Sequence, residues 1–205
     1  GALLGHVRSE IGRMERLTRD LLTLARSDRD ALRLAVGRVD LGALASELVS
    51  RVAVLAAEKG VRIDLQMGGG GVIVDGDPDR LEQIGLILLD NSIEHTPEGG
   101  QVRVGVRREG LYAVLDVVDS GEGIPRQHLR HVFDRFYRAD LARSRVTGGA
   151  GLGLSIAQTL VAAHGGRIAI RNDSGGGARA SVWLPLRSAE PAHEERRYAR
   201  AEKAR

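Results

Sequence analysis

Three polar stretches of the chain have residue types and spacing that could do chemistry, and the first is DSGEGIP, residues 119–125. It follows a run typical of a buried strand, and its glycines Gly121 and Gly123 would let a flat ligand lie against the backbone. A carboxylate at this place can accept a hydrogen bond from the exocyclic amine of adenine, whereas guanine presents a carbonyl there. Because a buried polar group without a partner costs about 1–3 kcal/mol, Asp119 could select adenine. Taken alone, the stretch is more often a simple turn.

The second stretch is GGAGLGLS, residues 148–155, which is rich in glycine and leads into a predicted helix. Backbone amides at a helix N-terminus favour phosphate. The spacing is neither that of a P-loop nor that of the dinucleotide fingerprint. A phosphate site and a flexible hinge are equally compatible with this stretch alone.

The third stretch is LLDNSIEHTPEGG, residues 88–100, in which an apolar helix continues into Asp90 and Asn91. An amide oxygen on a helix that faces the other two stretches could bind magnesium, a hard ion that prefers oxygen ligands. Asn91 is the candidate ligand. The alternative is a buried asparagine whose hydrogen bonds are satisfied within the protein.

The composition indicates one full domain and a smaller element. The chain has 205 residues, is 42% hydrophobic and has a formal net charge of +3 with mixed signs, which argues against a dedicated nucleic-acid surface. It has no cysteine, so disulfides and thiolate chemistry are excluded. No apolar run reaches the roughly 18 residues of a membrane span, and the N-terminus lacks the form of a signal peptide.

Hydrophobic periodicity divides the chain into residues 1–38, 39–187 and 188–205. The first part predicts a bundle-forming helix over about 3–33, with an a/d seam that includes Leu4, Val7, Ile11 and Met14. Such a helix needs a partner helix, unless it packs on the domain that follows. The last part is charged, lacks an apolar stripe and predicts a frayed tail.

The middle part predicts an α+β fold of two layers, a mixed sheet with helices on one face. Asp40 and Asp77 are expected to cap two helices at their N-termini, and Gly60 is expected to end the first. A tight turn at Glu109-Gly110 would join two strands. Helices are expected over 40–60, 77–95, 125–133 and 152–166, and a mobile loop over 138–151. Strands are expected over 61–67, 72–76, 167–172 and 178–186, and the two strands joined by the turn lie within 101–121.

Taken together and in this order, the stretches resemble the catalytic ATP-binding domain of bacterial sensor histidine kinases. LILLDNSIEHTP is similar to the N-box of that family, DSGEGI to its first glycine box, FDRFYR to its F-box and GGAGLGL to its second glycine box. GGGARASVWLP resembles the closing hairpin. The likeness covers about residues 39–187 and implies a Bergerat-type ATP-binding fold. The first helix, ending in DLLTLARSD, resembles the second helix of the dimerisation and phosphotransfer domain.

The resemblance implies a role for each matching residue. Asn91 would bind magnesium, Asp119 would bind the adenine amine, and Arg138 would approach the phosphates. Asn91 and Arg138 would be the catalytic residues. Phe133 and Phe136 would anchor the ordered lid. The implied contacts to ATP come from Asn91, His95, Asp119, Gly121, Gly123, Ile124, Arg138, Gly149, Gly151, Leu152, Gly153 and Leu154. For His95, packing at the helix end is the alternative.

The chain departs from the family pattern at several positions. Ile87 stands where the family has a second asparagine, which is expected to loosen magnesium binding, and Glu94 stands where the family often has a cation. Ala150 and Ala178 replace a common Thr or Ser. The acceptor histidine and its His-Glu-Leu-Arg-Thr-Pro context are missing, and His6 is a poor substitute. We therefore expect a fragment that begins after the acceptor helix.

The expected function is that of the kinase half of a two-component sensor, which transfers the γ-phosphoryl group of magnesium ATP to a histidine for relay to a response regulator. A hydrolysing ATPase of the wider superfamily is one alternative, but Ile87 stands where those relatives have a glutamate base. An ATP-sensing module without kinase activity is the other alternative, favoured by Ile87 and Glu94.

The expected partners are ATP, a dimerisation domain and a receiver domain. A homodimer is expected through residues 4–25 in the full protein, and no nucleic acid is expected to bind. The expected location is cytoplasmic, as the cytoplasmic part of a membrane-bound sensor.

Overall fold

A computed structural model describes residues 33–68, 71–138 and 150–186 of the chain. The helix predicted over 3–33, most of the loop predicted over 138–151 and the tail 188–205 lie outside these residues. Among the described residues, no helix is both long and apolar enough to cross a membrane.

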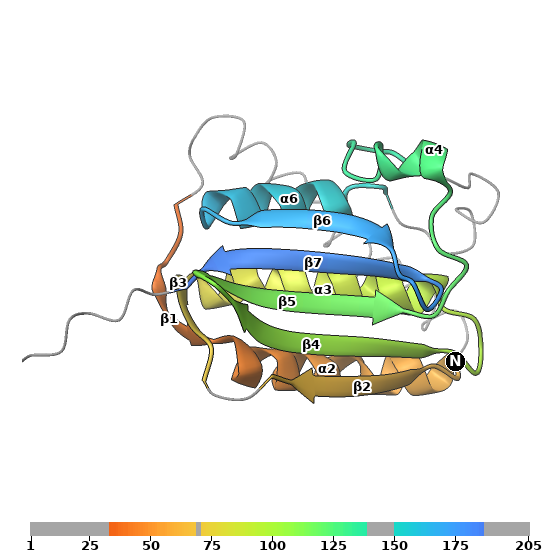
Figure 1. Cartoon of the computed structure of the whole chain (residues 1–205), viewed down its shortest axis with the longest axis horizontal. Helices are drawn as coiled ribbons and strands as arrows, with labels where there is room; N and C mark the ends of the chain where they lie inside the picture. Colours follow the sequence, from red (N-terminus) through yellow and green to blue (C-terminus); the bar gives the residue numbers. More distant parts are fainter. Residues whose placement is uncertain (1–32, 69–70, 139–149, 187–205) are drawn as a thin grey trace, which may run out of the picture.

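Five strands form a mixed sheet, as the sequence predicts (Figure 1). Its order is β2-β4-β5-β7-β6, where β2 pairs in parallel with β4 and all other pairs are antiparallel. The strands are β2 (Arg62–Met67), β4 (Gln101–Glu109), β5 (Tyr112–Asp119), β6 (Arg167–Asn172) and β7 (Ala178–Pro185).

Three helices cover one face of this sheet, so the predicted two-layer arrangement is confirmed (Figure 1). The alternation of side chains along the strands explains why one face is covered. In β4 the buried residues are Val102, Val104 and Val106, whereas the residues between them are only partly buried. Val117 of β5 is the register partner of Val104 and lies on the same buried face. The helices are α2 (Leu41–Glu58), α3 (Pro78–His95) and α6 (Gly153–Ala163).

The predicted caps of α2 and α3 are confirmed. The Asp40 carboxylate accepts from the amides of Gly42 (2.8 Å) and Ala43 (3.3 Å). The Asp77 carboxylate accepts from the amides of Asp79 (3.1 Å) and Arg80 (3.2 Å). Each cap satisfies two backbone donors that have no partner within the first turn of a helix.

Strand β1 was not predicted, and the helix predicted over 125–133 is too long. Strand β1 (Gly37–Asp40) pairs antiparallel with β3 (Ile73–Gly76) in a separate two-stranded sheet. Helix α4 is only Arg126–Leu129, and none of its residues is buried. The following amides donate to carbonyls three residues back, as His131 does to His128 and Asp134 to His131, which gives single turns instead of a longer helix.

Candidate nucleotide-binding site

Four elements that carry the predicted site end at the same edge of the domain, on the right in Figure 1. They are the C-terminal end of β5, the C-terminal end of α3, the N-terminal end of α6, and the turn between β6 and β7. The first glycine box leaves β5 at this edge, and the second glycine box enters α6 there. The tertiary structure therefore gathers the three stretches that the sequence singles out.

The Asp119 carboxylate is buried and held by two backbone amides. Asp119 is 7% exposed. Oδ1 accepts from the amide of Gly121 at 2.9 Å and from the amide of Ala178 at 3.0 Å. Both bonds use the same oxygen, so Oδ2 is the atom that is placed to accept from a ligand.

The loop after Asp119 is packed against neighbouring backbone. A Cβ on Gly121 would lie 2.4 Å from the carbonyl oxygen of His95, so this position requires glycine. Gly123 has φ +74° and lies beside Asn172 and Gly177. The His95 side chain is exposed, and its main chain is what contacts the loop.

Asn172, at the end of β6, clamps this loop from the other side. Its Oδ1 accepts from the amide of Ile124 at 2.7 Å, and its Nδ2 donates to the carbonyl oxygen of the same residue at 2.9 Å. One amide side chain thus bonds both main-chain groups of Ile124. This pairing fixes the end of the first glycine box relative to the sheet.

We expect Asn172→Ala to weaken the binding of ATP and of adenosine to the same extent, by about tenfold, a loss of about 1.4 kcal/mol. The loop that presents Asp119 and Gly121 to the base would lose both bonds to Ile124, whereas the phosphate end would be untouched. Calorimetry with both ligands measures the effect. Gln66→Ala, which removes an exposed amide from β2, is the matched control. Unchanged affinities for Asn172→Ala would refute the clamp.

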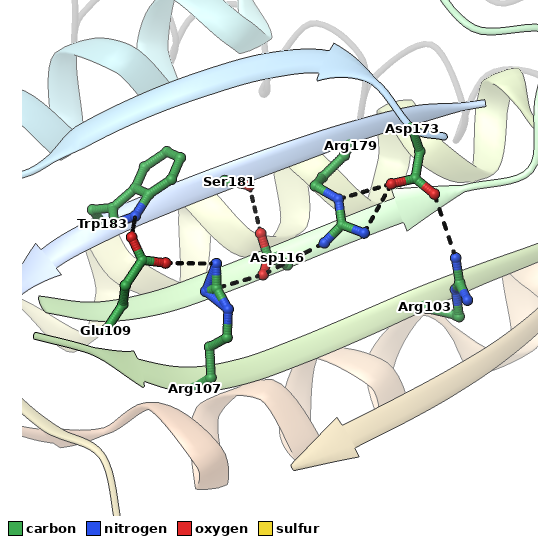
Figure 2. Close-up of polar contacts among 8 residues, drawn as sticks. All are labelled: Arg103, Arg107, Glu109, Asp116, Asp173, Arg179, Ser181 and Trp183. Carbon is green, nitrogen blue, oxygen red and sulfur yellow. Dashed lines mark hydrogen bonds and ion pairs between the residues drawn. The ribbon is translucent and has the colours of Figure 1, made fainter. Parts of the chain in front are cut away.

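The helix-free face of the sheet carries a charged network that ends at the β6–β7 turn (Figure 2). Asp116 is buried and accepts from the hydroxyl of Ser181 at 2.5 Å. Arg107 and Arg179 lie 3.4 Å and 3.8 Å from its other oxygen. Arg179 also donates twice to Asp173, at 3.0 Å and 2.8 Å. The remaining members of the network are Arg103, Glu109 and Trp183.

This network stabilises the turn that holds Asp119. The hydrogen bonds from Arg179 keep the pKa of Asp173 below its ordinary value, so its carboxylate is charged at neutral pH. Asp173 opens the turn, and its amide donates to the carbonyl oxygen of Gly177 at 3.0 Å. The next residue, Ala178, provides the amide that holds Oδ1 of Asp119. The network therefore lies one hydrogen-bonded turn away from the predicted adenine contact.

Asn91 lies on the last turns of α3 with its amide group oriented by its own helix. Nδ2 donates to the carbonyl oxygen of Ile87 at 2.7 Å. Because the amide group is planar, Oδ1 points away from that carbonyl and is the side-chain atom that can bind a cation. The orientation fits a magnesium ligand, since the ion prefers oxygen and shares it with phosphates and water. Within the described ranges, no group of three or more His, Cys, Asp or Glu side chains could hold a metal ion.

The N-terminal end of α6 lies beside Asn91. A Cβ added to Gly153 would lie 3.8 Å from Nδ2 of Asn91 and 3.3 Å from the Ile87 side chain. The N-cap residue is Leu152, whose side chain cannot accept from the first-turn amides, so these donors are suited to phosphate. Leu152 is 1% exposed and belongs to the core, and Leu154 is partly buried against that core.

The F-box segment packs directly on the second glycine box. The amide of Phe136 donates to the carbonyl oxygen of Gly151 at 2.8 Å, and a Cβ on Gly151 would lie 2.8 Å from the Phe136 backbone. Phe136 is 64% exposed and its φ is +65°. Its main chain, not its ring, makes this contact. Gly149 lies outside the described residues.

Arg138 and Glu94 meet across the site. Nη2 of Arg138 lies 3.7 Å from Oε1 of Glu94, on the last turn of α3. The cation expected to approach the phosphates is therefore paired with an acidic side chain of the N-box.

Sequence reasoning missed Asn172 and the amide of Ala178. Neither position has a distinctive residue type, because an asparagine at a strand end is common before a turn and an alanine has no functional side chain. The glycine-rich turn SGGGA, residues 174–178, was the available signal, since Gly176 and Gly177 both have positive φ.

Comparison with known proteins identifies the family. A model described as histidine kinase-, DNA gyrase B-, and HSP90-like ATPase matches residues 76–188. This match covers more than half of the chain, so the chain belongs to that family.

The chain is similar to sensor kinases among curated proteins. It is 34% identical over 180 residues to the signal transduction histidine-protein kinase BaeS of Escherichia coli (strain K12), a match that covers 88% of this chain and 38% of the relative. It is 38% identical over 188 residues to the probable sensor histidine kinase TcrY of Mycobacterium tuberculosis, covering 92% of this chain and 39% of the relative. The chain thus spans less than half the length of these relatives.

Solved structures share the fold. Full-length ShkA in complex with AMPPNP superposes with a TM-score of 0.76 at 28% identity, covering 88% of this chain and 37% of that chain. The Acinetobacter baumannii histidine kinase AdeS gives a TM-score of 0.75 at 20% identity, covering 92% and 86% of the two chains, and shows the fold alone. The resemblance to sensor histidine kinases and the Bergerat-type fold are confirmed.

Proposed function

We propose that this chain is the kinase part of a two-component sensor, which transfers the γ-phosphoryl group of magnesium ATP to a histidine nitrogen on a dimerisation helix. The observation that carries the proposal is the arrangement of three element ends at one edge of the sheet (Figure 1). The glycine box after Asp119 lies against the main chain of His95 at the end of α3, and Gly153 at the N-terminal end of α6 lies beside Asn91. A base acceptor, a cation ligand and a phosphate-binding helix end are the three parts that magnesium ATP requires.

Each part has a defined task in the proposal. Asp119 accepts from the adenine amine, with Gly121 and Gly123 beneath the base. Asn91 binds magnesium, which neutralises charge on the phosphates when it is bound. Arg138 and the backbone amides from Gly151 onwards contact the triphosphate. Phosphoryl transfer asks the protein mainly for positioning and charge neutralisation, so these groups suffice on the ATP side.

The partners follow from the proposed division of the chain into a dimerisation helix (1–38), the ATP-binding domain (39–187) and a charged tail (188–205). Residues 4–25 would form a homodimer seam in the full protein. The phosphorylated histidine would pass its phosphoryl group to an aspartate of a response regulator. These statements concern the whole protein, because the curated relatives are more than twice as long as this chain.

The test is phosphorylation in trans. The chain is incubated with γ-labelled ATP, alone and with a separate dimerisation domain whose acceptor helix can pair along the Leu4, Val7, Ile11 and Met14 seam. We expect ATP binding but no stable label on the chain alone, and label that is acid-labile and base-stable on the acceptor domain. Ile87 offers no base for water, so we also expect almost no hydrolysis.

One outcome would contradict the proposed kinase function, and a second would contradict the expected absence of the acceptor histidine. ATP binding without label on the acceptor domain would favour an ATP-sensing module, the alternative that Ile87 and Glu94 support. Acid-labile label on the chain alone, mapped to His6, would show that the acceptor is present after all.

A further inference from the structure

An acidic side chain, that of Glu94, is paired with Arg138, the cation that the proposed function places beside the phosphates. Nη2 of Arg138 lies 3.7 Å from Oε1 of Glu94. The Arg138 side chain is 20% exposed and that of Glu94 is 32% exposed, so water screens the pair only in part. Glu94 stands three residues after Asn91, almost one helical turn along α3, on the side of the helix that bears the proposed magnesium ligand.

The backbone on each side of the pair is held in place. Nζ of Lys59, at the C-terminal end of α2, donates to the carbonyl oxygen of Ile93 and, at 2.5 Å, to that of Glu94. On the other side, the amide of Phe136 donates to the carbonyl oxygen of Gly151 at 2.8 Å, two residues before Arg138. The last turn of α3 and the end of the F-box segment are thus both fixed, and the pair joins two anchored elements.

We propose that Glu94 competes with the nucleotide phosphates for Arg138. This competition lowers the affinity of the site for nucleotides, and the loss is larger for a nucleotide with more phosphates. This inference rests on the proposed function, since it places phosphates beside Arg138. A guanidinium binds carboxylate and phosphate oxygens with the same planar set of donors. A phosphate that approaches Arg138 must displace the Glu94 carboxylate or share the cation with it, and in either case it meets a like charge.

The opposite role for Glu94 predicts the opposite sign. If the carboxylate held Arg138 ready for the phosphates, its removal would release the guanidinium and weaken binding. The sign of the affinity change therefore separates competition from support. The affinity for adenosine is an internal reference, because the hydrogen bonds of Asp119 and Asn172 at the predicted adenine contact involve neither Glu94 nor Arg138.

The first experiment measures the affinity of the 205-residue chain and of Glu94→Gln for adenosine, ADP and ATP by calorimetry. We expect Glu94→Gln to bind ATP about tenfold more tightly, ADP by a smaller factor, and adenosine with unchanged affinity. Glu94→Ala serves as a second variant and is expected to change ATP affinity with the same sign. Glu58→Gln removes an exposed carboxylate near the end of α2 and is the matched control, with no expected change.

The second experiment is a double-mutant cycle with Arg138→Gln. Without the guanidinium there is nothing to compete for, so Glu94→Gln should raise ATP affinity much less in the Arg138→Gln background than in the parent chain. An equal gain in both backgrounds would mean simple repulsion between Glu94 and the nucleotide, and would overturn the competition. A loss of ATP affinity in Glu94→Gln, or an equal gain for adenosine, would also overturn it. If the parent chain bound no ATP at all, the proposed function itself would fail, which is a distinct result.

Discussion

Asp119→Asn is expected to weaken ATP binding by about a hundredfold while leaving the domain folded. The two backbone donors decide this outcome. The amides of Gly121 and Ala178 both point at one oxygen of Asp119, at 2.9 Å and 3.0 Å. An asparagine must turn its Oδ1 to these donors, because its Nδ2 would meet them donor to donor. Nδ2 is then forced into the place of Oδ2, where it would face the donor amine of adenine.

The variant loses one hydrogen bond to a charged group and gains a buried donor without a partner. Together these cost about 3 kcal/mol of binding free energy, or roughly a hundredfold in affinity. Calorimetry with ATP and GTP measures it. The affinity of Asp119→Asn for GTP should fall little or rise, because Nδ2 can donate to the guanine carbonyl. Asp64→Asn, on the exposed face of β2, is the matched control. Equal ATP and GTP affinities in the parent chain would remove the assignment of Asp119 to adenine.

Asn91→Ala is expected to abolish the gain in ATP affinity that magnesium provides. Asn91 is the one side chain assigned to the ion, and its Oδ1 is set by the bond from Nδ2 to the carbonyl oxygen of Ile87. Alanine favours helix more than asparagine does, so α3 should remain intact. The variant should bind ATP equally well with magnesium and with a chelator present.

The measurement is a pair of titrations of each protein, in magnesium and in EDTA, with circular dichroism as the folding check. Gln83→Ala removes a side-chain amide from the first turns of the same helix and should keep the magnesium-dependent gain. If Asn91→Ala showed the same magnesium dependence as the parent chain, another group would have to bind the ion.

Much of the fold could be predicted because its signals are local. Asp40 and Asp77 cap their helices by bonds to amides two and three residues later. Gly60 and Gly110 have positive φ at the helix end and hairpin turn where glycine was expected. The alternation of buried residues in β4 needs only a period of two. Interactions among neighbours in the chain are encoded in short stretches of residues, so residue types and spacing were enough to predict these elements.

The four-residue strand β1 could not be predicted, because it is too short to carry a period and is stabilised by pairing with the distant β3. The length of helix α4 was overestimated, because the residue types over 125–133 are compatible with a helix. After α4, the backbone amides bond to carbonyls three residues back, so the chain forms single turns there.

The sequence by itself determined the family and predicted which groups serve a nucleotide, namely Asp119, Asn91 and the glycine boxes, because residue types and their order carry that information. Only the tertiary structure decided how each is held. Asn172 bonds Ile124 across 48 residues, and Ala178 bonds Asp119 across 59. The pairing of Glu94 with Arg138 likewise joins α3 to the end of the F-box. Such partners are chosen by the distance between folded elements, and a hydrogen bond or ion pair that acts over about 3–4 Å leaves no trace in the spacing of residues along the chain.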